Sequence, residues 1–251
     1  MMNASLINYT LHLADNALTI GHRNSEWCGH GPVLEQDIAI SNIALDGIGQ
    51  ARNFYQYAAS LSGNGATEDT LAYLRDVIDY KNLLITELPN GDWAQTTLRQ
   101  FLFSTYQYFF YQQLEKSTDR QLAAIAEKSL KEVTYHVRWS SEWVIRLGDG
   151  TEESHKRLSN AVTELWNYTG ELFIPASYEK ELIATGIAVD LSVIQPLWQQ
   201  KVSGIFSEAT IAIPDKSFAQ QGGKEGIHTE HLGYILAEMQ FLQRAYPGAE
   251  W

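Results

Sequence analysis

One stretch of the sequence places a carboxylate and an imidazole at the spacing of neighbours on a helix. Glu132, Tyr135 and His136 recur three or four residues apart within residues 131–154, and two tryptophans continue the same face. Helical bundles present metal ligands in this way, from side chains on helices that face one another. The chemistry to test is therefore that of a di-iron carboxylate site.

A ferritin-like di-iron bundle needs a carboxylate from each of two helices and a Glu-x-x-His motif from each of two others. The literal matches to that motif are Glu152–His155 and Glu225–His228. The first match falls in the first turn of a helix, where Thr151 and the acidic residues favour a capping role. The second follows two glycines at a helix start, so a solvated helix entry is favoured over a metal pair of His228 and His231.

The stretch around Glu132 itself departs from the motif. The position three residues after Glu132, where the motif has histidine, holds Tyr135, and a phenol that is protonated near neutral pH is a poor ligand for iron(II). Asp46, Asp76 and Asp79 could add carboxylates from preceding helices. Their alternative interpretation is that each is a capping, water-bonded or arginine-paired acid.

One long helix offers no ligand at all. The segment Trp93–Leu114 contains no Asp, Glu or His, and its middle is apolar nearly all round, which is typical of a helix enclosed by neighbours. We therefore interpret the pattern as the remains of a di-iron site and predict no catalytic, cofactor-binding or metal-binding residue on this chain. The candidates for the vestigial site are Asp46, Asp76, Asp79, Glu132, Tyr135 and His136.

Composition and charge narrow the classes of partner. The chain has 251 residues, a mass of 28.3 kDa and 45% hydrophobic residues, which is enough for one large domain over residues 1–251. Its formal net charge of -12 and its pI near 5.0 disfavour nucleic acid and anionic membranes as partners. The sequence has no glycine-rich phosphate loop and no Gly-x-Ser-x-Gly motif.

The single cysteine, Cys28, excludes an internal disulfide and a thiolate-rich metal site, and it suits a reducing compartment. The first residues lack a basic region followed by an apolar one, and no run of about 20 uncharged apolar residues occurs. We expect a cytoplasmic protein without a secretory signal or a membrane span.

Capping residues, glycines and helical periodicity predict an all-α protein without a sheet. The expected architecture is a single antiparallel helical bundle with extra C-terminal helices. In the second helix, the residues predicted to face inward are Leu34, Ile38, Leu45, Ile48 and Ala51. The predicted helices cover Ser5 to Gly21, Val33 to about Ser62, Thr67 to about Glu87, Trp93 to Glu115, Asp119 to Leu147, Thr151 to Ile174, Tyr178 to Ala184, Ser192 to Ala209 and Ile227 to Ala245.

Three long stretches resemble one known family, in the family's order and over nearly the whole chain. They are GHGPVLEQDIAISNIALDGIGQAR, KEVTYHVRWSSEWVIRLGDGTEES and GIHTEHLGYILAEMQFLQRAYPGAEW. The family comprises the C subunits of the bacterial phenylacetyl-CoA epoxidases, which are ring 1,2-phenylacetyl-CoA monooxygenases. The resemblance implies a ferritin-like fold in an enzyme complex of aerobic phenylacetate degradation.

The resemblance also implies that the chain is a structural partner without its own cofactor. In the family, the di-iron centre lies in the related A subunit, which also binds the acyl-CoA. A small B subunit and an NADPH-dependent reductase with flavin and an iron–sulfur cluster complete the system. No catalytic residue is carried over, because the C subunit supplies none. We therefore expect a non-catalytic subunit of a hetero-oligomeric monooxygenase.

Two other functions remain open from the residues alone. The chain could be an autonomous di-iron oxidase or iron-binding protein that uses Glu132, His136 and the aspartates. It could also be a helical ligand-binding protein whose aromatic core holds a small apolar molecule. Stoichiometric iron would support the first function, and a deep aromatic-lined cavity in the isolated chain would support the second.

Overall fold

A computed structural model describes residues 2–63, 65–214 and 219–249. These residues form α-helices and short 3₁₀ turns and contain no strand, so the predicted all-α class is confirmed, and the antiparallel helices fit a ferritin-like bundle. The described residues divide into two compact units. Unit 1 draws on Met1–Pro89, Ala176–Leu182 and Gly222–Trp251, and unit 2 on Asn90–Pro175 and Ile183–Gln221. The single domain expected over residues 1–251 stays a prediction.

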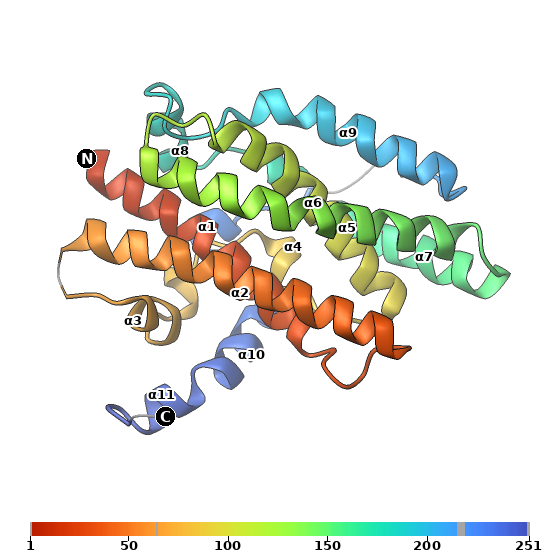
Figure 1. The fold of residues 1–251 in the computed structure, drawn as a ribbon, viewed down its shortest axis with the longest axis horizontal. Coiled ribbons are helices and arrows are strands. Elements are labelled where there is room, and N and C mark those ends of the chain that lie inside the picture. The colour runs from red at the N-terminus through yellow and green to blue at the C-terminus, as the bar shows by residue number, and fades with distance from the viewer. Residues whose placement is uncertain (1, 64, 215–218, 250–251) are drawn as a thin grey trace. The chain divides into compact units, whose positions relative to one another are not determined.

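Unit 1 is built on a pair of long antiparallel helices, α1 (Met2–Ser25) and α2 (Leu34–Ser62), which lie side by side (Figure 1). Shorter elements complete it. They are α3 (Glu68–Tyr73), the 3₁₀ turn η1 (Val77–Asp79), α4 (Leu84–Glu87), most of α8 (Ser177–Ile183), the 3₁₀ turn η4 (Gly223–Glu225), α10 (Glu230–Met239) and α11 (Phe241–Ala245).

Glycines bring α1 and α2 close together, and this corrects the predicted limits of the first helix. Gly21 does not end α1; it lies within the helix, where a Cβ would stand 3.2 Å from the Ala44 carbonyl oxygen of α2. A Cβ on Gly47 of α2 would stand 3.1 Å from the Ala17 carbonyl oxygen. Ser5 does not cap the helix either, because it is buried inside α1 and donates a hydrogen bond to Glu181 Oε2 (2.6 Å).

The predicted inward face of α2 was wrong. The side chains of Leu34, Ile38, Leu45 and Ile48 are 72%, 53%, 65% and 41% exposed, and of the predicted set only Ala51 is buried. Helix α2 carries two apolar faces, and periodicity alone does not decide which of them meets the core. The buried face consists of Ala39, Ile40, Ile43, Ala44, Gly47, Gln50, Ala51, Phe54, Tyr55 and Ala58.

The continuous third helix predicted to about Glu87 was also wrong, although Thr67 caps α3 as expected. After α3 the chain forms η1 and α4 with extended residues between them. Polar side chains of α1 take the backbone groups there: Asp15 accepts from Lys81 N–H (2.8 Å) and Asn16 from Leu83 N–H (2.7 Å). These side-chain hydrogen bonds satisfy backbone N–H groups that would otherwise bond to carbonyl groups within a helix.

The predicted last helix is interrupted and begins later than expected. Its residues form α10 and α11, with Gln240 at the junction. Gln240 is buried, and its Nε2 donates to the carbonyl oxygens of Ala72 (3.2 Å) and Arg75 (3.0 Å). The C-terminal segment is therefore tied to the turn that follows α3.

Unit 2 is built around α5 (Trp93–Leu114), which packs against α6 (Arg120–Gly148), α7 (Glu152–Leu165) and α9 (Leu191–Glu208). The predicted starts at Trp93, Asp119 and Thr151 agree with the structure to within one residue, and the side chains of Asp92, Asp119 and Thr151 cap these helices by accepting backbone N–H groups. Helix α5 is buried over most of its length, as predicted. Helix α7 stops short of the predicted end and continues as 3₁₀ turns to Phe173.

Among the described residues, no helix combines the length and the apolar character that crossing a bilayer requires.

Candidate functional site

The predicted ligands on α6 do not share one environment. His136 is buried, Glu132 is half-buried, and Tyr135 is 39% exposed, so the tyrosine does not lie on the inner face with His136 as expected. Burial is the main cause that raises the pKa of Tyr111 on the neighbouring helix α5, and the charge of Glu132 adds to it. The expected tryptophan face is present: Trp139 is buried and packs edge-on against a tryptophan of α5.

The predicted aspartates belong to unit 1, whereas the α6 residues belong to unit 2. Asp46 is half-buried on α2. Asp76 is exposed and pairs with Arg244 (2.9 Å). Asp79 is exposed, and its carboxylate accepts the backbone N–H of Asp76 (3.2 Å). Asp76 and Asp79 thus have the arginine-paired and capping roles that were the alternative interpretation.

The residues of the two literal Glu-x-x-His matches have structural roles. In the first, Thr151 forms a capping box with Ser154, and His155 Nδ1 lies 2.8 Å from the Gly148 carbonyl oxygen. In the second, the expected solvated helix entry is wrong: His228 precedes α10, and its side chain is only 1% exposed. Within residues 2–63, 65–214 and 219–249, no group of three or more His, Cys, Asp or Glu side chains is arranged to hold a metal ion.

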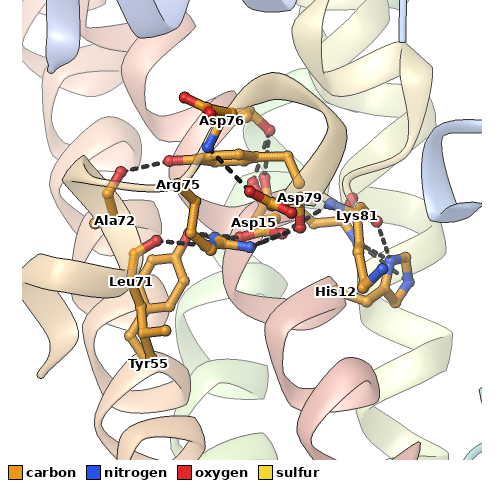
Figure 2. Close-up of polar contacts among 12 residues, drawn as sticks. His12, Asp15, Tyr55, Leu71, Ala72, Arg75, Asp76, Asp79 and Lys81 are labelled. Carbon is orange, nitrogen blue, oxygen red and sulfur yellow. Dashed lines mark hydrogen bonds and ion pairs between the residues drawn. The ribbon is translucent and has the colours of Figure 1, made fainter. Parts of the chain in front are cut away.

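A buried polar centre that was not predicted from the sequence lies in unit 1 around Asp15 of α1 (Figure 2). The Asp15 side chain is fully buried and forms an ion pair with Arg75. Tyr55 of α2 donates its hydroxyl to Asp15 Oδ1 (2.6 Å), and the backbone N–H of Lys81 donates to Oδ2 (2.8 Å). Both carboxylate oxygens are therefore engaged by partners from three separate stretches of chain.

Electrostatics fix the charge states of this centre. Burial is the largest single influence on Arg75 and lowers its pKa, but the charge and hydrogen bond of Asp15, together with the smaller influences of Tyr55 and Tyr80, outweigh it, so the pKa of Arg75 is raised. Burial raises the pKa of the Tyr55 hydroxyl, and the Asp15 charge raises it further. Asp15 thus meets a permanent cation and a phenol that keeps its proton.

One turn before Asp15, His12 joins the same network. Its Nδ1 lies 2.7 Å from the Lys81 carbonyl oxygen, to which it donates as a neutral ring. Burial, reinforced by the charge of Lys224, lowers the pKa of His12 to about 4. His12 is thus a neutral donor that fixes the extended segment beside α1.

Glu87 and His228 form a second buried ion pair in unit 1. The Glu87 side chain is fully buried, and its Oε2 lies 2.8 Å from His228 Nδ1. The other ring nitrogen of His228 lies 2.9 Å from the Tyr80 carbonyl oxygen. Because both ring nitrogens face acceptors, the ring holds both protons. Burial lowers the pKa of His228, but the Glu87 hydrogen bond and charge outweigh it, and the net pKa is raised.

Glu179 and Lys224 form a third buried pair in unit 1. Lys224 Nζ lies 2.9 Å from Glu179 Oε2, and the two side chains are 4% and 1% exposed. The same oxygen accepts the Ala176 backbone N–H (2.7 Å). Burial is the largest influence and raises the pKa of Glu179, but the charge and hydrogen bond of Lys224, together with the smaller influences of His12 and the Ala176 N–H, outweigh it, so the net pKa is lowered. Each of these three carboxylates already has a cation beside it.

Comparison with known proteins bears on how this architecture is used. The family model described as "Phenylacetic acid catabolic protein" matches residues 1–251. The chain belongs to this phenylacetic acid catabolic protein family. It is 47% identical over 246 residues to the C subunit of 1,2-phenylacetyl-CoA epoxidase from Escherichia coli (strain K12), and the match covers 98% of this chain and 99% of the relative.

The alternative of a di-iron centre on this chain can be examined at the buried acids. Asp15, Glu87 and Glu179 are neutralised by Arg75, His228 and Lys224, so a cationic metal would have to displace a buried cation at each. Helix α5 brings no carboxylate or imidazole. The described residues therefore do not fit a di-iron centre.

A sequence signal for the polar centre does exist. Within the apolar α1, the polar residues His12, Asp15, Asn16 and Thr19 recur at spacings of three and four, which places them on one face. All four are buried. A polar stripe inside an otherwise apolar helix indicates a network of buried partners, but it does not name them, because they come from residues 55–87.

Proposed function

We propose that this chain is the non-catalytic, structural subunit of a multicomponent di-iron monooxygenase. This enzyme epoxidises the ring of phenylacetyl-CoA in the aerobic, cytoplasmic degradation of phenylacetate. In this proposal, the iron lies in a catalytic A subunit, and a reductase with NADPH, flavin and an iron–sulfur cluster supplies electrons. Supporting evidence comes from the family and from the relative's name, which describes one subunit of an epoxidase.

The observation that carries the proposal is the outer face of α2. We define the α2 stripe as Leu34, Ile38, Leu45 and Ile48, which are 41% to 72% exposed. Their spacings of four, seven and three residues align them along one side of the helix. An aligned set of large exposed apolar side chains is typical of a protein interface rather than of a free surface.

The enclosed helix α5 is a weaker candidate for this interface. Its aromatic residues would suit a partner surface, yet 16 of the residues of α5 are buried. Helix α2 differs in this respect. Its inward face packs against α1, and its outer face carries the exposed apolar side chains of the α2 stripe. The interface is therefore assigned to α2.

A structural partner of this kind acts by holding the helices of the catalytic subunit in a fixed arrangement. Obligate interfaces commonly bury more than about 2,000 Å², and they stabilise the elements that they cover. A metal-bearing subunit must hold its ligands within about half an ångström, so a packed helix face on its outside supports its catalysis. This role requires no catalytic residue on the present chain.

The test is a variant of the α2 stripe, Ile38→Glu/Leu45→Glu, co-expressed with the catalytic subunit. Both positions are exposed, so we expect the variant to fold. Removing each central apolar side chain from an interface costs about 2 kcal/mol, about 30-fold in affinity, so the complex should dissociate on size-exclusion chromatography. With reductase and NADPH, oxygen-dependent turnover of phenylacetyl-CoA should fall in parallel.

Val193→Glu is the matched control, because Val193 is also an exposed apolar residue (48%) but lies on α9. It should leave the complex intact. Full complex formation by the α2 variant would refute the assignment of the interface to α2. A catalytic subunit that reaches full rate without this chain would refute the proposed function.

A further inference from the structure

A pocket in unit 2 lies between α5, α6 and α9 and has a volume of about 520 Å³ (Figure 1 shows the three helices). This volume is within the range of about 300–1,000 Å³ that is usual for small-molecule sites. Its apolar and aromatic walls include Tyr108, Phe109, Val137, Ile145 and Ile205. The pocket is independent of the α2 stripe and of the ion pairs of unit 1.

Two buried hydroxyls line this pocket without a hydrogen-bond partner in the described chain. Thr105 of α5 is fully buried, Ser141 of α6 is 6% exposed, and neither hydroxyl has a protein partner among the described residues. A buried hydroxyl without a partner costs about 1–3 kcal/mol. Two such groups from facing helices therefore indicate that something else supplies their hydrogen bonds.

Neighbouring hydroxyls on the same helices behave differently. One position earlier, Ser104 and Ser140 lie 3.3 Å apart across α5 and α6, and Ser140 also donates to the His136 carbonyl oxygen (2.7 Å). Thr134, at the edge of the pocket, donates to the Leu130 carbonyl oxygen (2.7 Å). Donation to the preceding turn is the usual arrangement for helical Ser and Thr. Thr105 and Ser141 depart from it at the pocket.

The charges at the rim set the class of ligand. Arg138 and Lys201 are balanced there by Glu142 and Glu208, and all four are exposed. A rim with equal numbers of both signs gives no net attraction for an anion or a cation. The half-buried rings of Tyr108 and Phe109 favour an aromatic body.

We propose that this pocket binds a small neutral aromatic molecule that carries one hydroxyl or carbonyl group, which Thr105 and Ser141 hold by hydrogen bonds. The apolar walls contact the ring, and the two buried hydroxyls recognise the polar group. This division between apolar body and few polar anchors is how small-molecule sites obtain orientation.

The test uses 2-phenylethanol and ethylbenzene, which differ by the hydroxyl group, as probes of the full chain in isothermal titration and in ¹H–¹⁵N spectra. We expect saturable binding of 2-phenylethanol that shifts resonances of α5, α6 and α9. Thr105→Val/Ser141→Ala should weaken 2-phenylethanol binding about 10- to 30-fold, the loss of two neutral hydrogen bonds, and leave ethylbenzene unchanged.

Ser129→Ala is the matched control, because Ser129 is another buried α6 hydroxyl without a partner among the described residues but does not line the pocket. It should leave the affinity for both probes unchanged. Tyr108→Leu should weaken both probes alike and keeps the proposal testable if the double variant misfolds. Absence of saturable 2-phenylethanol binding, or equal affinity in the double variant, would overturn the proposal.

Discussion

At the scale of single residues, three buried ion pairs help to determine how the chain is arranged in unit 1. Asp15, Glu87 and Glu179 have different partners, and each partner comes from another part of the chain. A buried ion pair adds little net stability over an apolar pair, but a wrong or missing partner leaves a charge uncompensated. The three pairs therefore select one arrangement of the chain over others.

Loss of Asp15 should be among the most costly changes in unit 1. Asp15→Ala leaves the guanidinium of Arg75, whose side chain is 12% exposed, and the Lys81 N–H without their acceptor. We expect a loss of about 3–5 kcal/mol in the free energy of unfolding, measured by urea denaturation. Asp76→Ala is the control, since its pair with Arg244 is exposed and such pairs contribute about 0–1 kcal/mol. Similar losses in both variants would contradict this account.

His228 should make stability depend on pH in a defined direction. Its pKa is raised in the folded state, so the stability from its pair with Glu87 is fully present below the unfolded value of about 6.5. That contribution is lost as the pH rises through the folded pKa. The difference in free energy of unfolding between the wild type and His228→Gln should shrink as the pH rises from about 6.5 to 9.

Two controls isolate this effect. His30→Gln alters an exposed histidine and should show no such trend. His12, whose pKa is lowered to about 4 in the folded state, is present in both the wild type and His228→Gln, so its titration cancels from their difference. A difference between wild type and His228→Gln that grows with pH would have the wrong sign.

The spacing of the candidate ligands on α6 was predictable from the sequence, but the partners in the buried ion pairs were not. His136 is buried as the pattern predicted, while Tyr135 points to solvent. The pairing of His228 with Glu87 gave no local signal, because the two residues are 141 positions apart and only the fold brings them together. Pairings at such separation depend on tertiary contacts, which neither periodicity nor capping encodes.

At the scale of elements, α1 and α2 approach each other closely because glycines, which have no side chain, lie at their contact. Gly47→Ala should destabilise the protein by about 1–3 kcal/mol, because the new methyl group meets the α1 backbone at Ala17. Gly49→Ala in the same helix is the control: nothing lies within 4 Å of its Cβ, so it should stabilise by up to about 1 kcal/mol through helix propensity. Thermal unfolding of both variants measures the contrast. Equal effects would show that the contact is not tight.

The helices themselves were largely predictable, and their faces and interruptions were not. Three helix starts, at Trp93, Asp119 and Thr151, were predicted to within one residue, and Asp92, Asp119 and Thr151 cap these helices in the structure. The break of the third helix depends on buried side chains of α1 that take its backbone groups, which is not a local property. The apolar α2 stripe was assigned to the core because periodicity does not distinguish a buried apolar face from an exposed one.

At the scale of the whole molecule, the described residues form a helical bundle in which no three His, Cys, Asp or Glu side chains gather to hold a metal ion. We predict that the purified chain, loaded with iron(II) under anaerobic conditions and then desalted, retains no stoichiometric iron in elemental analysis. The physical reason is that Asp15, Glu87 and Glu179 already have buried cations as partners. A di-iron content that is lost in Glu132→Ala and kept in the exposed-site control Glu127→Ala would contradict this prediction.

The position of Lys224 and His228 late in the chain has a consequence for biosynthesis. Domains tend to fold as they leave the ribosome, N-terminal parts first. All segments of unit 2 are translated before residue 222, whereas unit 1 waits for its last segment. Until then the nascent chain exposes Glu87 and Glu179 without their cations. A message truncated before codon 222 would yield a polypeptide that cannot complete unit 1 and is open to cellular proteases.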